Sequence, residues 1–280
     1  MITLAGIRRQ TTYSPNHVSN DAKIFLRTVE RLNEKGFRVN IYDEHDLGLV
    51  DIKERVIFSM AQGVESTLLL NELEEKGKII INSPKGSINS YRTNMVKILP
   101  EKGLPFPKSF VINVEEKNKI KFEDFNARKI WIKRGDVHAI HREDVTVVYS
   151  EEEKNNIITE FAWRGIRDVV LQEHLDGDVI KFYSVRNTSL FHWFYLNGIN
   201  HTPFEIKLLK DLGNKAADAL GLEVYGGDAI VSEEGKISII DINDWPSFAP
   251  VREEASVAIA ELIVKKINNY ISGDNYNGSN

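Results

Sequence analysis

The stretch Asp228-Ala-Ile-Val-Ser-Glu-Glu-Gly-Lys-Ile-Ser-Ile-Ile-Asp241-Ile-Asn243 decides how the second half of this sequence folds. Two β-branched, apolar-rich runs flank Glu234-Gly235, a pattern that predicts a β-hairpin with a two-residue turn. A turn centred there places Val231 opposite Ser238. It also places Asp228 directly opposite Asp241.

Three oxygen-bearing side chains are expected on one face of this hairpin. Directly opposed residues of an antiparallel pair have Cβ atoms about 4.5–5.5 Å apart, so the carboxylates of Asp228 and Asp241 would repel each other. Asn243 lies two residues beyond Asp241, on the same face of the strand. Such hard oxygen ligands suit Mg²⁺, which completes its octahedron with water and nucleotide phosphates. The hairpin therefore predicts a magnesium site, and the alternative is an ordinary hairpin whose acids face solvent.

Composition sets the broad class of the protein. The chain has 280 residues, of which 42% are hydrophobic and 28% charged, and this is typical of a soluble globular protein. A net charge of −5 gives no basic field, so we expect no nucleic-acid partner. The absence of cysteine excludes disulfides, thiolate catalysis and zinc–thiolate sites. The N-terminal run lacks the order of a signal peptide and no stretch is long enough to span a membrane, so we expect a cytoplasmic protein without a membrane partner.

The first third of the chain alternates strand and helix, which predicts a parallel sheet with helical crossovers. We expect one helix to be capped at Ser19-Asn20-Asp21 and ended by Gly36, and another over Gly63–Lys76. The expected strands are Met1–Ile7, Phe37–Tyr42, Arg55–Met60 and Ile79–Ile81. We assign residues 1–90 to this α/β domain.

The remainder reads as two α+β units followed by a polar tail. Helices are expected from Tyr91 towards Gly103, over Glu151–Gly165, over Glu205–Leu220 and over Glu253–Tyr270. Strands are expected at Lys108–Ile112, Lys129–Lys133, Val145–Tyr149, Asp168–Glu173, Val179–Arg186 and Ser189–Leu196. We place one unit in residues 91–175 and the other in residues 176–272. Residues 273–280 are expected to be disordered.

These pieces, in this order, resemble an ATP-grasp enzyme over roughly residues 80–270. The motif that carries the resemblance is Gly226-Gly-Asp228 followed by Ile-Asp241-Ile-Asn243-Asp-Trp-Pro246. The resemblance implies a pre-ATP-grasp domain with a parallel sheet, followed by a two-subdomain ATP-grasp fold that binds ATP and Mg²⁺. It also implies that Asp228, Asp241 and Asn243 are the metal ligands.

Three further motifs are similar to the nucleotide-binding parts of that family. Ile130-Trp-Ile-Lys133 resembles the strand whose lysine reaches the ATP phosphates, and Val169–Leu175 resembles the hinge strand beside adenine and ribose. Gly177-Asp178-Val-Ile-Lys181 resembles the strand that carries a catalytic cation to the transferred phosphoryl group. The residues implied to contact nucleotide are Lys133, Gln172, Glu173, His174, Leu175 and Asp178, and Lys181 is implied to be catalytic. The alternative for each lysine is a surface position on an alternating strand.

The sequence departs from the family pattern in two places. Arg92 stands where a further nucleotide-contacting lysine is usual, and Lys97 lies five residues later on another face of the same helix. We include Arg92 among the nucleotide-binding residues and leave open whether Arg92 or Lys97 contacts phosphate. The usual glycine-rich phosphate loop is also missing, since Gly135 is the only glycine between Lys133 and Asp144.

Length and layout are most similar to RimK-type amino-acid ligases. Members of that class transfer the γ-phosphoryl group of ATP to a carboxylate, and an amine or thiol then attacks the acylphosphate. Inositol polyphosphate kinases of the same fold are the alternative, because they carry Asp-x-Asn, as in Asp241-Ile-Asn243, and a histidine five residues after the phosphate lysine. His138 has that spacing from Lys133 and is the third catalytic candidate beside Lys181 and Arg252.

The acceptor is expected to be a small acidic molecule. Arg252 follows the metal-binding strand and is a candidate clamp for a carboxylate or phosphate, with a surface contact as its alternative. Ligands bind at the carboxyl ends of parallel strands, so residues after the first strand are further acceptor candidates. These are Arg8, Arg9, Asn16 and His17, and the alternative is that they belong to a structural loop. No pattern in the sequence predicts an oligomeric state.

Overall fold

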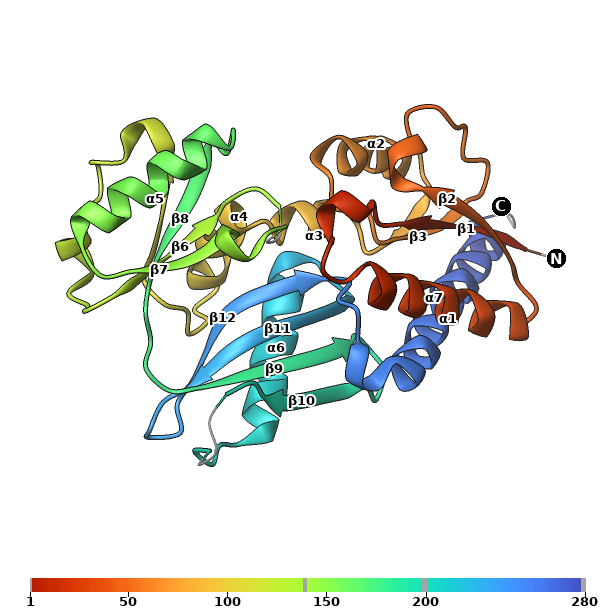
Figure 1. Cartoon of the computed structure of the whole chain (residues 1–280). Coiled ribbons are helices and arrows are strands. Elements are labelled where there is room, and N and C mark those ends of the chain that lie inside the picture. The colour runs from red at the N-terminus through yellow and green to blue at the C-terminus, as the bar shows by residue number, and fades with distance from the viewer. Residues whose placement is uncertain (1, 138–139, 198–200, 278–280) are drawn as a thin grey trace.

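Three four-stranded sheets organise the chain (Figure 1). The computed structural model describes residues 2–137, 140–197 and 201–277. One sheet is parallel and the other two are antiparallel, and each has its own helices. The predicted fold class, a parallel-sheet domain followed by two α+β units, is therefore confirmed.

The N-terminal domain has a parallel sheet of order β2-β1-β3-β4. Helix α1 packs an apolar face that includes Phe25 and Leu32, and it ends before Gly36, whose φ of +85° suits glycine. Its first residue is Val18, so the expected cap at Ser19-Asn20-Asp21 lies inside the first turn instead. The elements are β1 (Thr3–Arg8), α1 (Val18–Glu34), β2 (Arg38–Asp43), β3 (Val56–Ser59), α2 (Val64–Glu75), β4 (Ile79–Ile81) and α3 (Pro84–Asn89).

The middle of the chain forms a small subdomain around an antiparallel sheet of order β5-β8-β6-β7. Helix α5 covers one face of this sheet, and its Ile158 and Phe161 pack against Ile130 and Leu171. Helix α4 (Arg92–Glu101) precedes the sheet but packs its Met95 and Leu99 into the core of the last third. The elements are β5 (Ser109–Asn113), β6 (Ile130–Arg134), β7 (Val145–Val148), α5 (Glu151–Trp163) and β8 (Asp168–Glu173).

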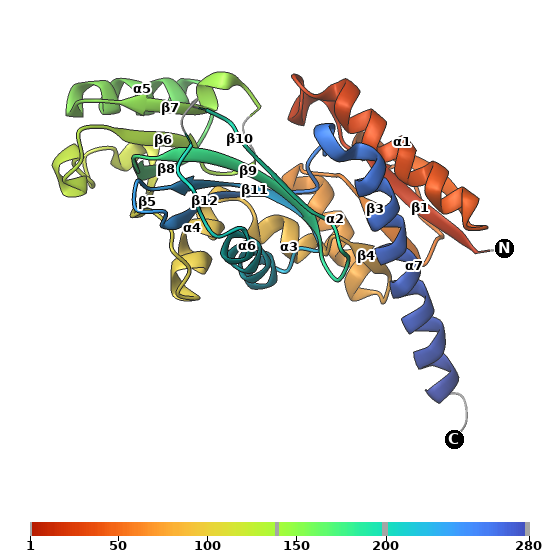
Figure 2. The same cartoon turned by 90° about the horizontal axis from the view of Figure 1, so that it is seen from below.

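The C-terminal subdomain carries an antiparallel sheet of order β10-β9-β11-β12, with α6 packed on one side of it (Figure 1). Helix α7 leaves this sheet and lies beside α1 of the N-terminal domain (Figure 2). It continues to Asn277, so the part of the expected tail before residue 278 is helical. The elements are β9 (Asp178–Val185), β10 (Phe191–Tyr195), α6 (Ile206–Leu220), β11 (Val224–Val231), β12 (Ile237–Asp244) and α7 (Arg252–Asn277).

The hairpin of β11 and β12 corrects one predicted detail. Its turn is one residue longer than the predicted two, because Ser232 donates its backbone N–H to Lys236 and Gly235 takes a φ of +75°. Val231 therefore faces Ile237, and its predicted pairing with Ser238 is wrong. A β-bulge between Asp228 and Ala229 absorbs the extra residue, so the predicted pairing of Asp228 with Asp241 is correct.

The hydrophobic cores show which parts form continuous bodies. One core joins the N-terminal domain to the last subdomain, because Leu4, Phe25 and Phe58 share it with Trp245 and Ile259. The small subdomain has a separate core of its own. Within the described part of the chain, no helix has both the length and the apolarity that crossing a membrane requires.

Candidate active site

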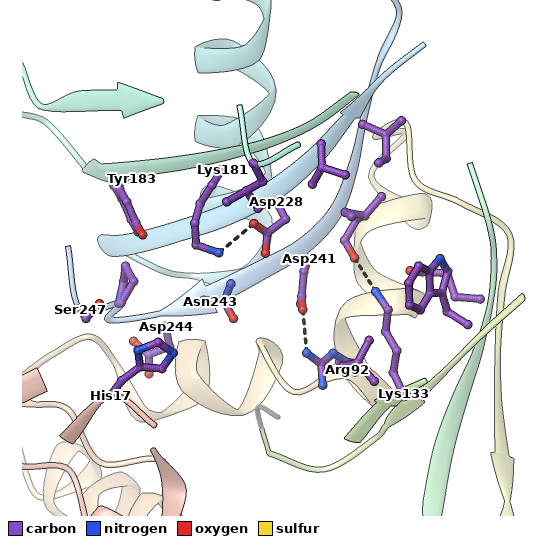
Figure 3. A pocket seen from close by; sticks show the side chains of 18 of the residues that line it. His17, Arg92, Lys133, Lys181, Tyr183, Asp228, Asp241, Asn243, Asp244 and Ser247 are labelled. Carbon is purple, nitrogen blue, oxygen red and sulfur yellow. Dashed lines mark hydrogen bonds and ion pairs between the residues drawn. The ribbon is translucent and has the colours of Figure 1, made fainter. Parts of the chain in front are cut away.

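Two rows of residues, one from each of three neighbouring strands, cross the same face of the C-terminal sheet. Lys181, Asp228 and Asp241 are register partners on the neighbouring strands β9, β11 and β12. The next row on that face holds Tyr183, Gly226 and Asn243. The site begins as a cross-strand ladder, and the predicted metal ligands and the predicted catalytic lysine all lie on it (Figure 3).

The bulge in β12 turns a backbone carbonyl into part of the site. Ile240 is the residue that the ladder skips between Ile239 and Asp241. Its carbonyl oxygen accepts a hydrogen bond from Nζ of Lys133, at 3.3 Å, from the small subdomain. The irregular register thus connects the two subdomains at the point where the metal-ligand candidates lie.

The opposite wall of the site comes from β6. Trp131 and Lys133 alternate onto one face of this strand, and both line the cavity. Lys133 is only 6% exposed. Burial lowers its pKa from 10.5 to about 8, although nearby Asp241 raises it in part, while the positive charge of Arg92 lowers it. Lys133 is thus a buried cation whose charge is costly until an anion approaches.

The hinge segment predicted to hold the base and ribose lies along the same wall. Four of its residues line the cavity: Gln172, Glu173, His174 and Leu175. The indole Nε1 of Trp131 donates to Nδ1 of His174 at 3.0 Å, and Nε2 of His174 lies 3.1 Å from Asp176. Burial lowers the pKa of His174, which favours the neutral imidazole that accepts this bond.

Arg92 enters the site from the first residue of α4. Its Nη2 donates to Oδ2 of Asp241 at 2.8 Å, and the two side chains are 6% and 11% exposed. Its Nη1 reaches the carbonyl oxygen of Arg134 at 3.4 Å. Of the two cations that the sequence left open, Arg92 lines the cavity, whereas Lys97 is exposed and does not.

Lys181 is paired in the same way within the ladder. Its Nζ lies 2.8 Å from Oδ1 of Asp228, and the side chains are 26% and 20% exposed. Burial alone would lower the pKa of Lys181, but the charge of Asp228 and their hydrogen bond raise it above its usual value. Burial also raises the pKa of Tyr183, the neighbouring residue on this face. Lys181 is therefore a fixed cation beside a neutral phenol.

These walls enclose a cavity of about 730 Å³ that also reaches the N-terminal domain. Tyr13, His17 and Gln62 line it from that side, near the carboxyl ends of the parallel strands. Ser247, which follows β12, lines it from the other side. The volume falls within the range of small-molecule and cofactor sites.

Arg9, an acceptor candidate from sequence, joins the domains. Its Nε donates to the carbonyl oxygen of Met60 at 3.1 Å, and its Nη1 pairs with Asp21 at 2.9 Å. Its Nη2 donates to the carbonyl oxygen of Trp245 at 2.9 Å. Asp244 also connects the two domains, because it accepts hydrogen bonds from Asn82, at 2.5 Å, and from Ser87. Burial raises the pKa of Asp244.

Several predicted residues lie away from the cavity lining. Arg252 begins α7 and donates to Oδ1 of Asn20 at 2.9 Å. Asp178 accepts the backbone N–H of Thr202 at 2.7 Å. Arg8 pairs with Asp43 on the surface. His138 lies outside the described residues.

Two cavity residues were missed by the sequence reasoning although a signal was present. Trp131 precedes Lys133 by two positions, and Tyr183 follows Lys181 by two. Period-2 alternation along a strand puts each on the face of its lysine. Tyr13 and Gln62 carry no comparable signal, because only the tertiary fold brings their loops to the cavity.

The donor set of the ladder fits Mg²⁺. Asp228, Asp241 and Asn243 offer hard oxygen atoms from adjacent strands on one face. Among the residues that the structure describes, no group of three or more His, Asp or Glu side chains could hold a metal. The protein would therefore supply only part of the coordination, as is usual for Mg²⁺ that also binds water and substrate phosphates.

Solved structures resemble the whole chain. D-alanyl-alanine synthetase A from Vibrio cholerae matches 96% of this chain and 98% of its own, with a TM-score of 0.71 and 12% identity. D-alanine–D-alanine ligase from Bacillus anthracis complexed with ATP has the same TM-score, with 13% identity over 98% of this chain and 100% of its own. A RimK domain protein ATP-grasp from Sphaerobacter thermophilus has a TM-score of 0.69 and 14% identity, covering 93% and 98%. The chain therefore has the ATP-grasp fold.

One curated relative is similar in sequence. The tetrahydromethanopterin:alpha-L-glutamate ligase of Methanococcus maripaludis is 25% identical over an alignment of 257 residues, which covers 82% of this chain and 83% of that protein. No protein-family model matches the sequence.

Proposed function

We propose that the protein is an ADP-forming ligase that uses Mg·ATP to activate a carboxylate of a small acidic substrate and joins it to an amine. The single observation that carries the proposal is the cavity between the two antiparallel sheets. There Lys133, Lys181 and Arg92 line the same cavity as Asp228, Asp241 and Asn243, and Arg92 and Lys181 are paired with the two carboxylates. Cations and metal ligands so arranged suit a polyphosphate.

The relatives support the same class of reaction. Their names describe ligases that act on glutamate and on D-alanine. We propose an amino acid as one of the two substrates on this basis. The kinase alternative rests on the Asp-x-Asn motif of Asp241 and Asn243 and on His138, and His138 lies outside the described residues.

In the proposed reaction, a carboxylate oxygen attacks the γ-phosphorus of ATP, the bond to the β–γ bridging oxygen breaks, and ADP leaves. The amine nitrogen then attacks the acyl carbon, phosphate leaves with the C–O electron pair, and the amine loses a proton. Lys133, Lys181 and Arg92 would bind phosphoryl oxygens and spread their developing charge. Asp228, Asp241 and Asn243 would hold Mg²⁺, which when bound neutralises the same oxygens.

The fate of the γ-phosphate tests this proposal. We would incubate the protein with γ-labelled ATP, Mg²⁺, a mixture of amino and dicarboxylic acids, and hydroxylamine. A ligase releases the label as inorganic phosphate, in an amount equal to the hydroxamate and the amide formed together. Label in a stable organic phosphate, without hydroxamate, would identify a kinase and overturn the ligase.

Asp241→Asn is the matched variant for that assay. It keeps the size of the side chain and one oxygen but removes a metal-binding charge. We expect turnover to fall by roughly 100-fold or more, as for the loss of a group that stabilises transition-state charge. Full turnover in this variant would mean that Asp241 is not a metal ligand.

A further inference from the structure

Both carboxylates of the candidate metal site already have a cation from the protein itself. Arg92 holds Asp241 and Lys181 holds Asp228, each pair at 2.8 Å (Figure 3). The pair of Arg92 and Asp241 is almost fully buried, so its attraction is weakly screened by solvent. A divalent cation that binds these carboxylates must compete with both side chains.

Arg92 retains hydrogen-bonding capacity for a different partner. Its Nε is buried and donates to no acceptor among the described residues. A guanidinium offers five N–H donors in a planar fork that matches phosphate as well as carboxylate. Because Arg92 begins α4 and lines the cavity, a phosphate group there would compete with Asp241 for the same guanidinium.

The local charges favour a particular order of binding. Three cations, Lys133, Lys181 and Arg92, surround the two carboxylates of the ladder. A divalent cation that arrives alone finds both carboxylates paired and is repelled by the positive charges of Arg92 and Lys181 beside them. A nucleotide polyphosphate is attracted by all three cations. When Arg92 or Lys181 turns to a phosphate oxygen, the carboxylate that it was paired with becomes available to the metal.

We propose that Arg92 and Lys181 are exchangeable counter-ions. Each holds its carboxylate, Asp241 or Asp228, in position until a nucleotide phosphate binds the cation instead, and only then can the divalent cation bind that carboxylate. This inference rests on the proposed function, because it assumes that a nucleotide occupies the cavity. It assigns Arg92, the departure from the usual lysine, a role in coupling metal binding to nucleotide binding. The coupling is reciprocal, so each ligand raises the affinity for the other by one factor.

Binding of Mn²⁺, a spectroscopic substitute for Mg²⁺, tests this directly and without turnover. Free Mn²⁺ is measured by electron paramagnetic resonance with and without a non-hydrolysable ATP analogue. In the wild-type protein we expect the analogue to raise Mn²⁺ affinity by about 5- to 150-fold, the usual range for coupled sites. In Arg92→Gln we expect Mn²⁺ to bind several-fold more tightly in the absence of the analogue. The factor by which the analogue raises Mn²⁺ affinity should fall by the same amount.

Arg27→Gln is the matched control for the change in net charge. Arg27 lies on the exposed face of α1 and pairs with Glu30 at 2.7 Å, outside the cavity. The Arg27→Gln variant should have the wild-type Mn²⁺ affinity both with and without the ATP analogue. If Arg92→Gln leaves Asp241 too poorly compensated to fold, Lys181→Gln tests the same exchange at Asp228.

The results separate this inference from the function on which it rests. Failure of the analogue to bind the wild-type protein would overturn the proposed function. If the analogue binds but neither variant tightens Mn²⁺ alone, the nucleotide site stands and the counter-ion exchange is wrong. Equal tightening in Arg27→Gln would reduce the effect to net charge and overturn the exchange as well.

Discussion

Lys133 is the residue whose surroundings most constrain its chemistry. It is buried, it donates to the carbonyl oxygen of Ile240, and its pKa is lowered to about 8. Between this value and the 10.5 of an ordinary lysine, the unfolded chain binds more protons than the native one. Its contribution therefore makes the protein more stable as the pH rises through that window. The positive charge is retained at neutral pH against a cost in stability, which points to a role in binding an anion.

The first prediction follows from that lowered pKa. A phosphate beside Lys133 favours the ammonium form, so nucleotide binding at a pH above about 8 should be accompanied by proton uptake. Isothermal titration calorimetry in two buffers of different ionisation enthalpy measures this uptake. Lys133→Met should abolish it and weaken binding. Lys97→Met, which removes an exposed lysine from α4, should change neither, and undiminished uptake in Lys133→Met would contradict the assignment.

At the scale of elements, strand β11 is constrained by its glycines. A Cβ on Gly227 would lie 2.5 Å from the ring of Phe182 and 2.7 Å from the carbonyl oxygen of Asp241. The strand lies between β9 and β12, so neither neighbour has room to retreat without disturbing the ladder. The close approach of β11 to the ring of Phe182 on β9 and to the backbone of β12 is thus part of what holds Lys181, Asp228 and Asp241 in one row.

Gly227→Ala should test this packing. We expect the free energy of unfolding in urea to fall by about 1–3 kcal/mol, as for other overpacked cores. Gly48→Ala is the matched control, since the nearest atom to its new Cβ is a methyl carbon of Leu69 at 3.9 Å. The control should have the same free energy of unfolding as the wild-type protein. An unchanged free energy of unfolding in Gly227→Ala would mean that the strands can move apart freely, and would contradict this account of the packing.

The same strands show what the sequence predicts and what it does not. Alternation and turn residues predicted the strands and the opposition of Asp228 and Asp241, because both are local properties of the chain. They did not predict the longer turn or the bulge. The extra turn residue and the bulge shift the pairing by one residue in opposite directions, so Asp228 still pairs with Asp241 as in a regular hairpin. Arg92 as the partner of Asp241 was also beyond reach, because α4 and β12 meet only in the tertiary fold.

At the scale of the whole molecule, the cores divide the chain into unequal bodies. Helix α1 packs on α7, where Phe25 and Leu32 share a core with Ile259 and Ile263, and Arg27 pairs with Glu253 at 3.0 Å. The first ninety residues therefore depend on the last helix to cover the apolar face of α1. The small subdomain keeps a core to itself and meets the others across the cavity.

This division predicts how fragments of the chain behave. A fragment of residues 1–90 should lack a cooperative thermal transition, because the apolar face of α1 would be exposed to water without α7. A fragment of residues 104–175 contains the whole core around Ile132, Phe161 and Leu171, so it should unfold cooperatively. Near-ultraviolet circular dichroism during heating distinguishes the two cases. Adding α7 back by fusing residues 246–277 to the first fragment should restore a transition. A cooperative transition in residues 1–90 alone would mean that the N-terminal sheet is stable without the shared core.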